Sequence, residues 1–262
     1  MKNKIHILIF IAVLTVMSCS QNSYEKELNG KWYGLENDGY TRFFFYPDSL
    51  IITELGSQNV QWTANNATIE YNYNLRFGPS ANSIKKFKTA YILSKSKDTL
   101  FCKIKDSTEE ISFSLMRADN YLNFLSKKNE VDFELPSNTK IEHFDLDGNY
   151  GFKIFIGTKN GTLKIMTEYG NGLDSIQSDI LKFKQNINPQ EEYEKRILNY
   201  KIHFRVFADK SISNEKLNSY IQELDGGEIN RVYRIYKSEE YENLRYLRGE
   251  RINTNANISY IK

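Results

Sequence analysis

Two stretches decide the fold of the N-terminal half: Thr99-Leu100-Phe101-Cys102-Lys103-Ile104 and Glu110-Ile111-Ser112-Phe113-Ser114-Leu115-Met116-Arg117. In the first, Leu100, Cys102 and Ile104 share one face, and in the second Ile111, Phe113 and Leu115 oppose two serines. A period of two is typical of strands that bury one side. We therefore predict two antiparallel strands whose apolar sides face a common core.

The same pattern extends back to residue 31. Strands are predicted over 31–35, 41–46, 50–55, 59–63, 68–73 and 89–94, between short turns rich in Asn, Asp and Gly. No crossover helix separates them, so successive strands should pair. The fold predicted for residues 28–118 is an all-β antiparallel meander that closes into a barrel.

The C-terminal half has a different pattern. Phe152–Thr158 and Thr162–Glu168 flank Asn160-Gly161, a strong signal for a two-residue hairpin that pairs Ile156 with Ile165. A helix capped by Asn171, a strand over 200–208, a helix capped by Ser213 and a strand over 229–236 follow. The order ββαβαβ predicts a small α+β domain, with a mixed sheet and helices on one face.

The N-terminus carries a secretory signal pattern. Lys2 and Lys4 precede the apolar run 5–16, which is too short to span a bilayer, since a helix needs about 20 residues. Val16-Met17-Ser18-Cys19 resembles the lipobox of bacterial lipoproteins. That resemblance implies that Cys19 becomes the lipid-bearing first residue and anchors the chain in the bacterial cell envelope. By the same resemblance, Ser20 after the cysteine implies the outer membrane, and the lack of an acidic cluster in the tether implies that the chain faces the periplasm.

Composition limits the function classes. The chain has 35 basic and 33 acidic residues, and removal of residues 1–18 takes away two lysines, which leaves 33 of each. A neutral chain has no overall field that attracts nucleic acid, so no nucleic-acid partner is expected. Because Cys19 is assigned to lipid, Cys102 has no disulfide partner.

These patterns divide the chain into six segments. They are a lipoprotein signal peptide (1–18), a polar tether (19–27), the barrel (28–118), a linker with short elements (119–149), the α+β domain (150–237), and a short helix with a tail (238–262).

The first predicted domain resembles a known family. Gly30-Lys31-Trp32 is similar to the G-x-W signature of lipocalins, and Arg117 ends the last strand as in that family. The resemblance implies that Trp32 plugs one end of the barrel and that Arg117 lies across its ring; the alternative is that Trp32 is simply a large core residue. Such a barrel either holds one small ligand or is filled by side chains. The candidates for the lining, or for the core, are Phe43, Phe45, Tyr71 and Tyr73.

A basic segment interrupts the predicted barrel. Between Glu70 and Asp98 there is no acid, and Gly78-Pro79-Ser80 indicates an irregular loop. We expect this loop either to be a solvated surface or to form a patch for an anion or a lipid headgroup. The patch residues are Arg76, Lys85, Lys86 and Lys88.

The second predicted domain resembles the periplasmic domain of the ExbD/TolR biopolymer-transport family over roughly residues 150–237. The motifs are Phe207-Ala208-Asp209-Lys210 at the end of one strand and Ile229-Asn230-Arg231-Val232 at the start of the next. The family's transmembrane helix and its proton-carrying Asp have no counterpart here. The resemblance therefore implies self-association or contact with an envelope protein, and not transport.

No residue pattern in the sequence indicates catalysis. His143 and His203 are not spaced as metal ligands, and His203 is expected at the surface. Cys102 is interpreted as a buried, inert thiol, and Asp145–Asn149 as a turn because it departs from a calcium loop. We expect no enzyme activity, metal or cofactor.

Two functions remain in view. The first is a membrane-anchored lipoprotein whose barrel binds a small apolar or amphipathic ligand. The alternative is an envelope assembly or scaffold protein, with a filled barrel, whose α+β domain contacts another envelope protein or the cell wall.

Overall fold

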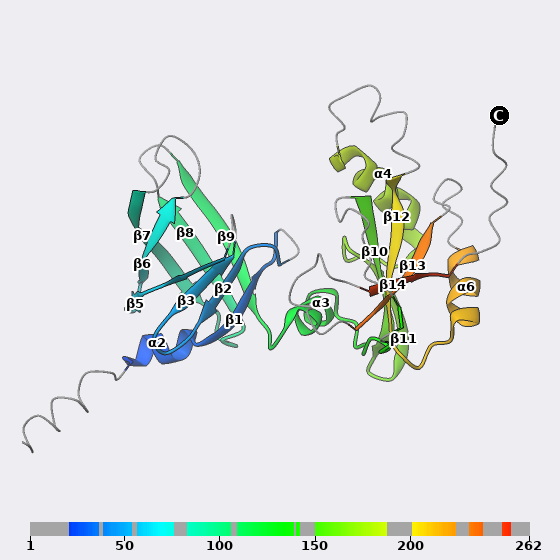
Figure 1. Ribbon diagram of the computed structural model, residues 1–262, viewed down its shortest axis with the longest axis horizontal. Helices are drawn as coiled ribbons and strands as arrows, with labels where there is room; N and C mark the ends of the chain where they lie inside the picture. Colours follow the sequence, from blue (N-terminus) through cyan, green and yellow to red (C-terminus); the bar gives the residue numbers. More distant parts are fainter. Residues whose placement is uncertain are drawn as a thin grey trace, which may run out of the picture. The chain divides into compact units, whose positions relative to one another are not determined.

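The computed structural model describes residues 21–36, 39–53, 57–75, 83–105, 109–138, 140–141, 150–187, 201–223, 231–237 and 248–252. The chain divides into two compact units, Met1–Asp119 and Asn120–Lys262. Each unit is built around its own β-sheet (Figure 1). The predicted signal peptide, Cys19, Arg76, His143 and the turn at 145–149 lie outside the described residues.

The first unit, here called the barrel unit, begins with helix α2 (Ser23–Leu28) and continues as a nine-stranded antiparallel sheet that is nearly closed and barrel-like. The predicted antiparallel meander is thus confirmed. Its order is β4-β3-β2-β1-β9-β8-β7-β6-β5. The strands are β1 (Gly30–Gly34), β2 (Arg42–Phe45), β3 (Leu50–Thr53), β4 (Ser57–Val60), β5 (Trp62–Ala64), β6 (Thr68–Leu75), β7 (Ser83–Leu93), β8 (Thr99–Lys105) and β9 (Glu110–Arg117).

Three elements differ from the prediction. The strand expected over 59–63 breaks at Gln61 into β4 and β5, because its two halves pair with different neighbours. Strand β7 begins at Ser83, so Lys85, Lys86 and Lys88 belong to a strand and not to a loop. Part of the expected tether forms α2, whose residue Leu28 is fully buried.

The two edge strands of this sheet are β4 and β5, which are consecutive in sequence. β5 covers the first half of β6, and near its end β6 is joined to β4 by a side chain. The Gln58 amide donates to the Asn74 carbonyl oxygen at 2.6 Å and accepts from the Asn74 N–H at 3.0 Å. One side chain therefore replaces a ladder pair and satisfies backbone groups that an open edge would leave unpaired.

The second unit, here called the mixed-sheet unit, has the order β11-β10-β12-β13-β14. The βαβ crossover is confirmed, because β12 and β13 pair in parallel on either side of α6 in the chain. After helix α3 (Tyr121–Asn129), its elements are β10 (Gly151–Lys159), β11 (Thr162–Thr167), the 3-10 helix η2 (Leu173–Ser175), α4 (Ile176–Ile187), β12 (His203–Ala208), α6 (Asn214–Glu223), β13 (Val232–Tyr236) and β14 (Arg248–Arg251).

The hairpin at Asn160-Gly161 is also confirmed. Ile156 pairs with Ile165 as predicted, and the two turn residues have φ angles of 52° and 77°. Positive φ at both central positions belongs to a type I′ turn, which Asn-Gly favours.

Two predictions for this unit are wrong. Asn171 does not cap a helix, because its amide donates instead to the buried carboxylate of Asp179 at 2.8 Å, and η2 starts after Gly172 without a side-chain cap. Residues 248–251, expected at the end of a helix and in a loose tail, form β14 and pair with β13.

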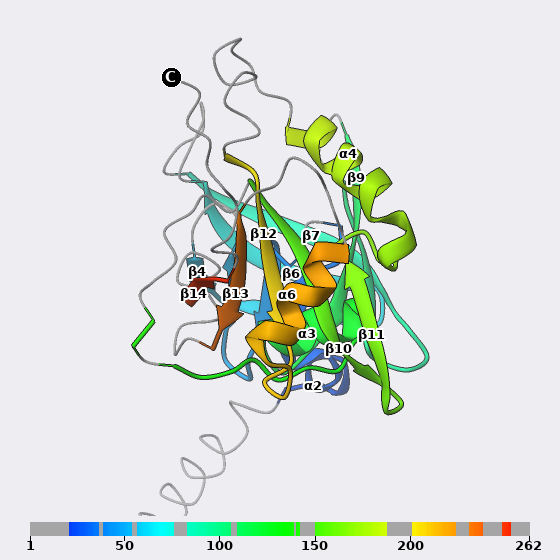
Figure 2. The same cartoon turned by 90° about the vertical axis from the view of Figure 1, so that its right-hand side faces the viewer.

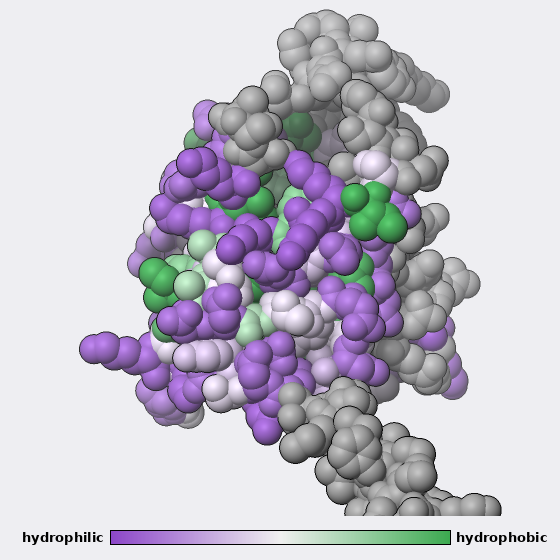
Figure 3. Space-filling view, turned by 90° about the vertical axis from the view of Figure 1, so that its left-hand side faces the viewer, coloured by the Kyte–Doolittle hydropathy of each residue, from purple (hydrophilic) through white to green (hydrophobic). Residues whose placement is uncertain are grey.

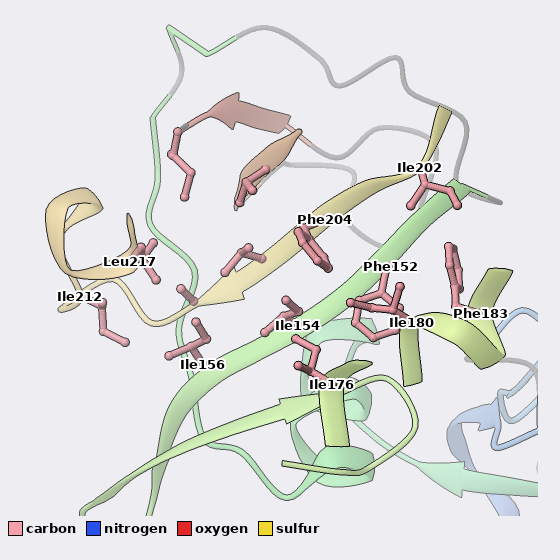
Figure 4. Packing of buried hydrophobic residues seen from close by; sticks show 14 residues of the cluster. Phe152, Ile154, Ile156, Ile176, Ile180, Phe183, Ile202, Phe204, Ile212 and Leu217 are labelled. Carbon is pink, nitrogen blue, oxygen red and sulfur yellow. The ribbon is translucent and has the colours of Figure 1, made fainter. Parts of the chain in front are cut away.

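One buried cluster of the mixed-sheet unit lies on the face of its sheet that α4 and α6 cover (Figure 2). In Figure 4, Phe152 from β10 lies against Ile180 and Phe183 from α4, and the Phe152 and Phe183 rings are 5.4 Å apart. On β10, a Cβ added at Gly157 would lie 2.2 Å from the Asp132 carbonyl oxygen. Glycine thus allows the 131–135 segment to approach the strand.

The seam of the barrel unit can be tested with Gln58→Ala. We expect the free energy of unfolding to fall by about 1–3 kcal/mol, because the substitution leaves a backbone donor and a backbone acceptor of Asn74 without partners. Urea denaturation followed by tryptophan fluorescence measures this, since both tryptophans, Trp32 and Trp62, belong to this unit. The control Gln61→Ala, at an exposed position, should stay within about 0.5 kcal/mol of the parent. Equal stability of the two variants would contradict the closure.

Candidate binding site in the barrel

One end of the barrel is closed by α2 and the first strand. The Trp32 indole N–H donates to the Leu28 carbonyl oxygen at 2.7 Å, and both residues are fully buried. The Arg117 guanidinium lies over the Trp32 ring, 4.4 Å from its centroid, and donates to the Glu27 carbonyl oxygen. Gly30 begins β1 with a φ of 128°, a conformation that favours glycine. We call this the closed end.

Burial of the inner face decreases toward the opposite end. Leu100 and Leu115, near the closed end, are fully buried, whereas Ile111, on the same face of β9, is 55% exposed. Phe87 and Phe113 lie between these extremes as partly buried residues. We call this end the mouth; the strand ends that form it are Leu75, Ser83, Lys105 and Glu110.

The four predicted lining residues belong to one aromatic cluster. Phe43 is 6.1 Å from Phe45 and 6.1 Å from Tyr71, measured between ring centroids. Phe45 packs against Trp62 at 4.7 Å and is buried, so it belongs to the core. Tyr73 is only partly buried and therefore lies nearer the mouth.

Two further residues complete this cluster: the sequence pattern placed Phe113 on the apolar face of its strand without naming it as a lining residue, and it missed Phe87. Phe87 stacks on Tyr71 at 5.6 Å and meets Tyr73 edge-on at 6.1 Å, and Phe113 stacks on Phe43 at 5.9 Å. The alternation of Lys85, Phe87 and Thr89 is the sequence pattern that would have indicated a strand with Phe87 on its inner face. This strand was not predicted because lysine is depleted in β-strands.

Thr89 is a polar group on the inner face of the barrel. It lies opposite Ile69 and Ile104, one inward position deeper than Phe87, and is 1% exposed. Its hydroxyl is buried and makes no hydrogen bond with the described residues. A buried hydroxyl without a partner is unfavourable, so a water or a ligand atom at this point would stabilise it.

The predicted basic patch is divided by strand alternation. Lys85 faces inward beside Tyr73, with its Nζ 5.4 Å from the centroid of the Phe87 ring, whereas Lys86 and Lys88 face outward. Both outward lysines pair with Glu70, at 2.7 Å and 3.5 Å, and the hydrogen bond from Lys86 lowers the pKa of that carboxylate. Lys85 therefore lies on the opposite face of the strand from Lys86 and Lys88. The negative charge of Glu70 partly neutralises the latter two.

The outer surface of the barrel unit is mostly polar. In Figure 3 hydrophilic side chains cover most of the visible face, and hydrophobic ones form small separate groups. A hollow of about 320 Å³ lies on the outer face of β7, β8 and β9, where Ala90, Ser112 and Ser114 are flanked by Ile92 and Phe101. Its lining also includes Tyr91, Cys102 and Phe113, which lie between these residues along the strands.

The residues considered for chemistry are placed as follows. Cys102 is buried on the inner face, and burial, together with the charge of Glu36, raises its pKa to about 12. His203, predicted at the surface, is buried; its Nε2 accepts from Arg205 Nε at 3.1 Å. The prediction is wrong because β12 is a central strand that is buried on both faces.

Within the described ranges, no cluster of three or more His, Cys, Asp or Glu side chains is arranged to hold a metal ion. The helices in that part of the chain lack the combination of length and apolar character that crossing a membrane requires.

Comparisons of the chain with models of protein families, with curated proteins and with solved structures found no match. The interpretation of the barrel therefore rests on its own geometry.

The Cys102 thiol predicts a dependence of stability on pH. The pKa of this thiol is raised from 9.0 to about 12 in the folded chain. The buried neutral thiol therefore makes its full contribution to the free energy of unfolding below pH 9, and this contribution is lost as the pH rises toward 12. We expect the difference in unfolding free energy between the parent and Cys102→Ala to fall by about 1.4 kcal/mol per pH unit above pH 9. Denaturation of both proteins at several pH values measures this, and the difference should be constant below pH 8. Parallel profiles up to pH 11 would contradict the burial of the thiol.

Proposed function

We propose that this chain is a non-enzymatic lipoprotein of the bacterial cell envelope, anchored through Cys19, whose barrel binds one small apolar or amphipathic molecule at its mouth. The observation that carries the proposal is the gradient of burial along the inner face. One end is sealed by Trp32, Arg117 and α2, whereas aromatic side chains are partly accessible at the other.

The mouth offers the surface that an apolar ligand needs. Tyr73, Phe87 and Phe113 present rings there, and the contact area of aromatic rings contributes strongly to binding. Deeper on β7, the Thr89 hydroxyl makes no hydrogen bond with the described residues and would accept or donate one to a ligand. This combination favours a molecule with an apolar body and at least one polar atom.

The lipocalin-like interpretation of the barrel belongs to the same proposal. Gly30 with its positive φ, the buried Trp32 and the Arg117 guanidinium on its ring support it. These three features join the start and the end of one meander, which is the arrangement implied by the resemblance to lipocalins.

The alternative is a scaffold protein that acts through the mixed-sheet unit. Strand β11 is an edge of that sheet, and its Leu163 is exposed, so a strand from another protein or a second copy would add there. The ExbD/TolR-like interpretation belongs to this alternative. The half of the barrel next to the closed end is filled by side chains, which is compatible with the scaffold alternative.

The ligand proposal is tested with a chain of residues 20–262 and the fluorescent apolar probe N-phenyl-1-naphthylamine. We expect Phe87→Glu to weaken binding at least about tenfold, because the carboxylate would have to lose water beside the probe. The matched control is Ile84→Glu, three residues away on the outer face of the same strand, which should bind as the parent does.

Native mass spectrometry of the same chain, before and after solvent extraction, identifies the natural ligand. An adduct of defined mass that extraction removes supports binding and gives its chemical class. Equal probe binding by the two glutamate variants, with no adduct, would refute the ligand proposal, and a clean dimer would favour the scaffold.

The anchor is tested separately with Cys19→Ser. We expect the variant to move from the membrane fraction to the soluble fraction, because the acyl chains would no longer be attached. Cell fractionation measures this, with Cys102→Ser as a control that should stay in the membrane fraction. Retention of Cys19→Ser in the membrane would argue against a lipid as the sole anchor.

A further inference from the structure

The chain between the proposed lipid and the folded barrel is very short. Only Ser20 and Gln21 separate Cys19 from Asn22, the N-cap of α2. An extended chain spans at most about 3.3–3.6 Å per residue, so Asn22 lies within about 11 Å of Cys19 whatever path the chain takes.

Asn22 is firmly connected to the barrel. Its side chain accepts from the Glu25 N–H at 2.9 Å, and the Glu25 carboxylate accepts from the Asn22 N–H at 3.0 Å, which completes a capping box. The Asn22 amide donates to the Ala64 carbonyl oxygen at 2.8 Å, and Lys97 pairs with Glu27 at 2.8 Å. Helix α2 is thus part of the closed end and does not lengthen the tether.

We propose that the closed end of the barrel lies against the lipid surface and that the mouth points away from it. This rests on the proposed lipidation of Cys19. The headgroup layer is about 5–8 Å deep on each side of a bilayer, so a lipid-bearing Cys19 lies at that level. A reach of about 11 Å then holds α2 in contact with the surface or close above it.

The surface of the closed end fits this position. We define it as α2 together with the turns 46–49, 65–67 and 94–98. Its exposed rings are Tyr24 and Tyr46, and tyrosine is enriched at the membrane–water interface. Four acids and three lysines lie in these segments, so electrostatic attraction to anionic lipid does not hold the closed end at the surface. The contact between the closed end and the lipid should therefore be insensitive to salt.

With the closed end against the surface and the barrel axis along the bilayer normal, the mouth lies far from the lipid. Strand β7 has 11 residues, which span about 35 Å, or about 25 Å along the barrel axis at the usual strand tilt. A ligand would therefore enter from the aqueous compartment and not from the bilayer.

The test uses the full lipidated chain with Cys102→Ala, reconstituted in phospholipid vesicles that contain a headgroup spin-labelled lipid. A fluorescent label is attached at Lys95→Cys, just beyond the closed end of β7, or at Ile84→Cys, at its mouth end. We expect the spin label to quench fluorescence at Lys95→Cys, with the same loss at high salt, and not at Ile84→Cys.

The control inserts a Gly/Ser linker of about 20 residues between Gln21 and Asn22, which extends the tether by roughly 25 Å. Quenching at Lys95→Cys should then fall to the level of Ile84→Cys. Quenching at Ile84→Cys in the parent, or unchanged quenching after the insertion, would overturn the proposal. Intact mass is measured first: a chain without acyl groups would refute both the anchor and this orientation, whereas a lipidated chain with a quenched mouth refutes only the orientation.

Discussion

The contact between Arg117 and Trp32 joins three parts of the barrel unit that are far apart in sequence. Arg117 ends β9, Trp32 lies on β1, and both bond to backbone carbonyls at the end of α2. A guanidinium on an indole contributes about 0.5–2 kcal/mol, and the indole N–H would otherwise be buried without a partner. Because this contact fills one end of the barrel, the partly accessible inner-face rings lie toward the other end. The same contact holds the end of α2 against the barrel.

A second constraint is that the backbone N–H and C=O groups on the edge strands of the nine-stranded sheet need hydrogen-bond partners. The structure meets it by breaking one strand at Gln61, so that β4 and β5 lie at the two edges and stay covalently joined. Gln58 bridges the remaining gap between β4 and β6. Its polar side chain lies on the inner face, but its amide N–H and its carbonyl oxygen both bond to the Asn74 backbone. Thr89 makes no such hydrogen bond with the described residues, so under the proposed function Thr89, and not Gln58, is the position for a polar ligand atom.

Local signals predicted the elements that depend on local physics. The Asn160-Gly161 turn, the alternation in β8 and β9, and the Ser213 cap are encoded within a few residues and were found. The start of β7 was missed because its lysines disfavour strands, and the acid that compensates two of them, Glu70, lies on another strand. His203 was misplaced for a similar reason, since its burial depends on the neighbours of β12.

The candidate site was predicted only in part: alternation identified inward-facing rings, but the exposure of Phe87 and Phe113 follows from how the strands end at the mouth.

Charge pairing and burial distinguish the two ends of the barrel. Lys86 and Lys88 both pair with Glu70 on the outer face, so one acid partly offsets the charge of two cations of the basic segment. In the proposed arrangement, membrane association would depend on the lipid at Cys19, which lies next to the closed end in the sequence. Lys85 is the cation that the structure places beside the mouth rings, where its ammonium lies over Phe87. A ligand whose apolar part covers these rings and whose polar or anionic group reaches Lys85 would satisfy both features, which makes an amphipathic molecule a better fit than a pure hydrocarbon.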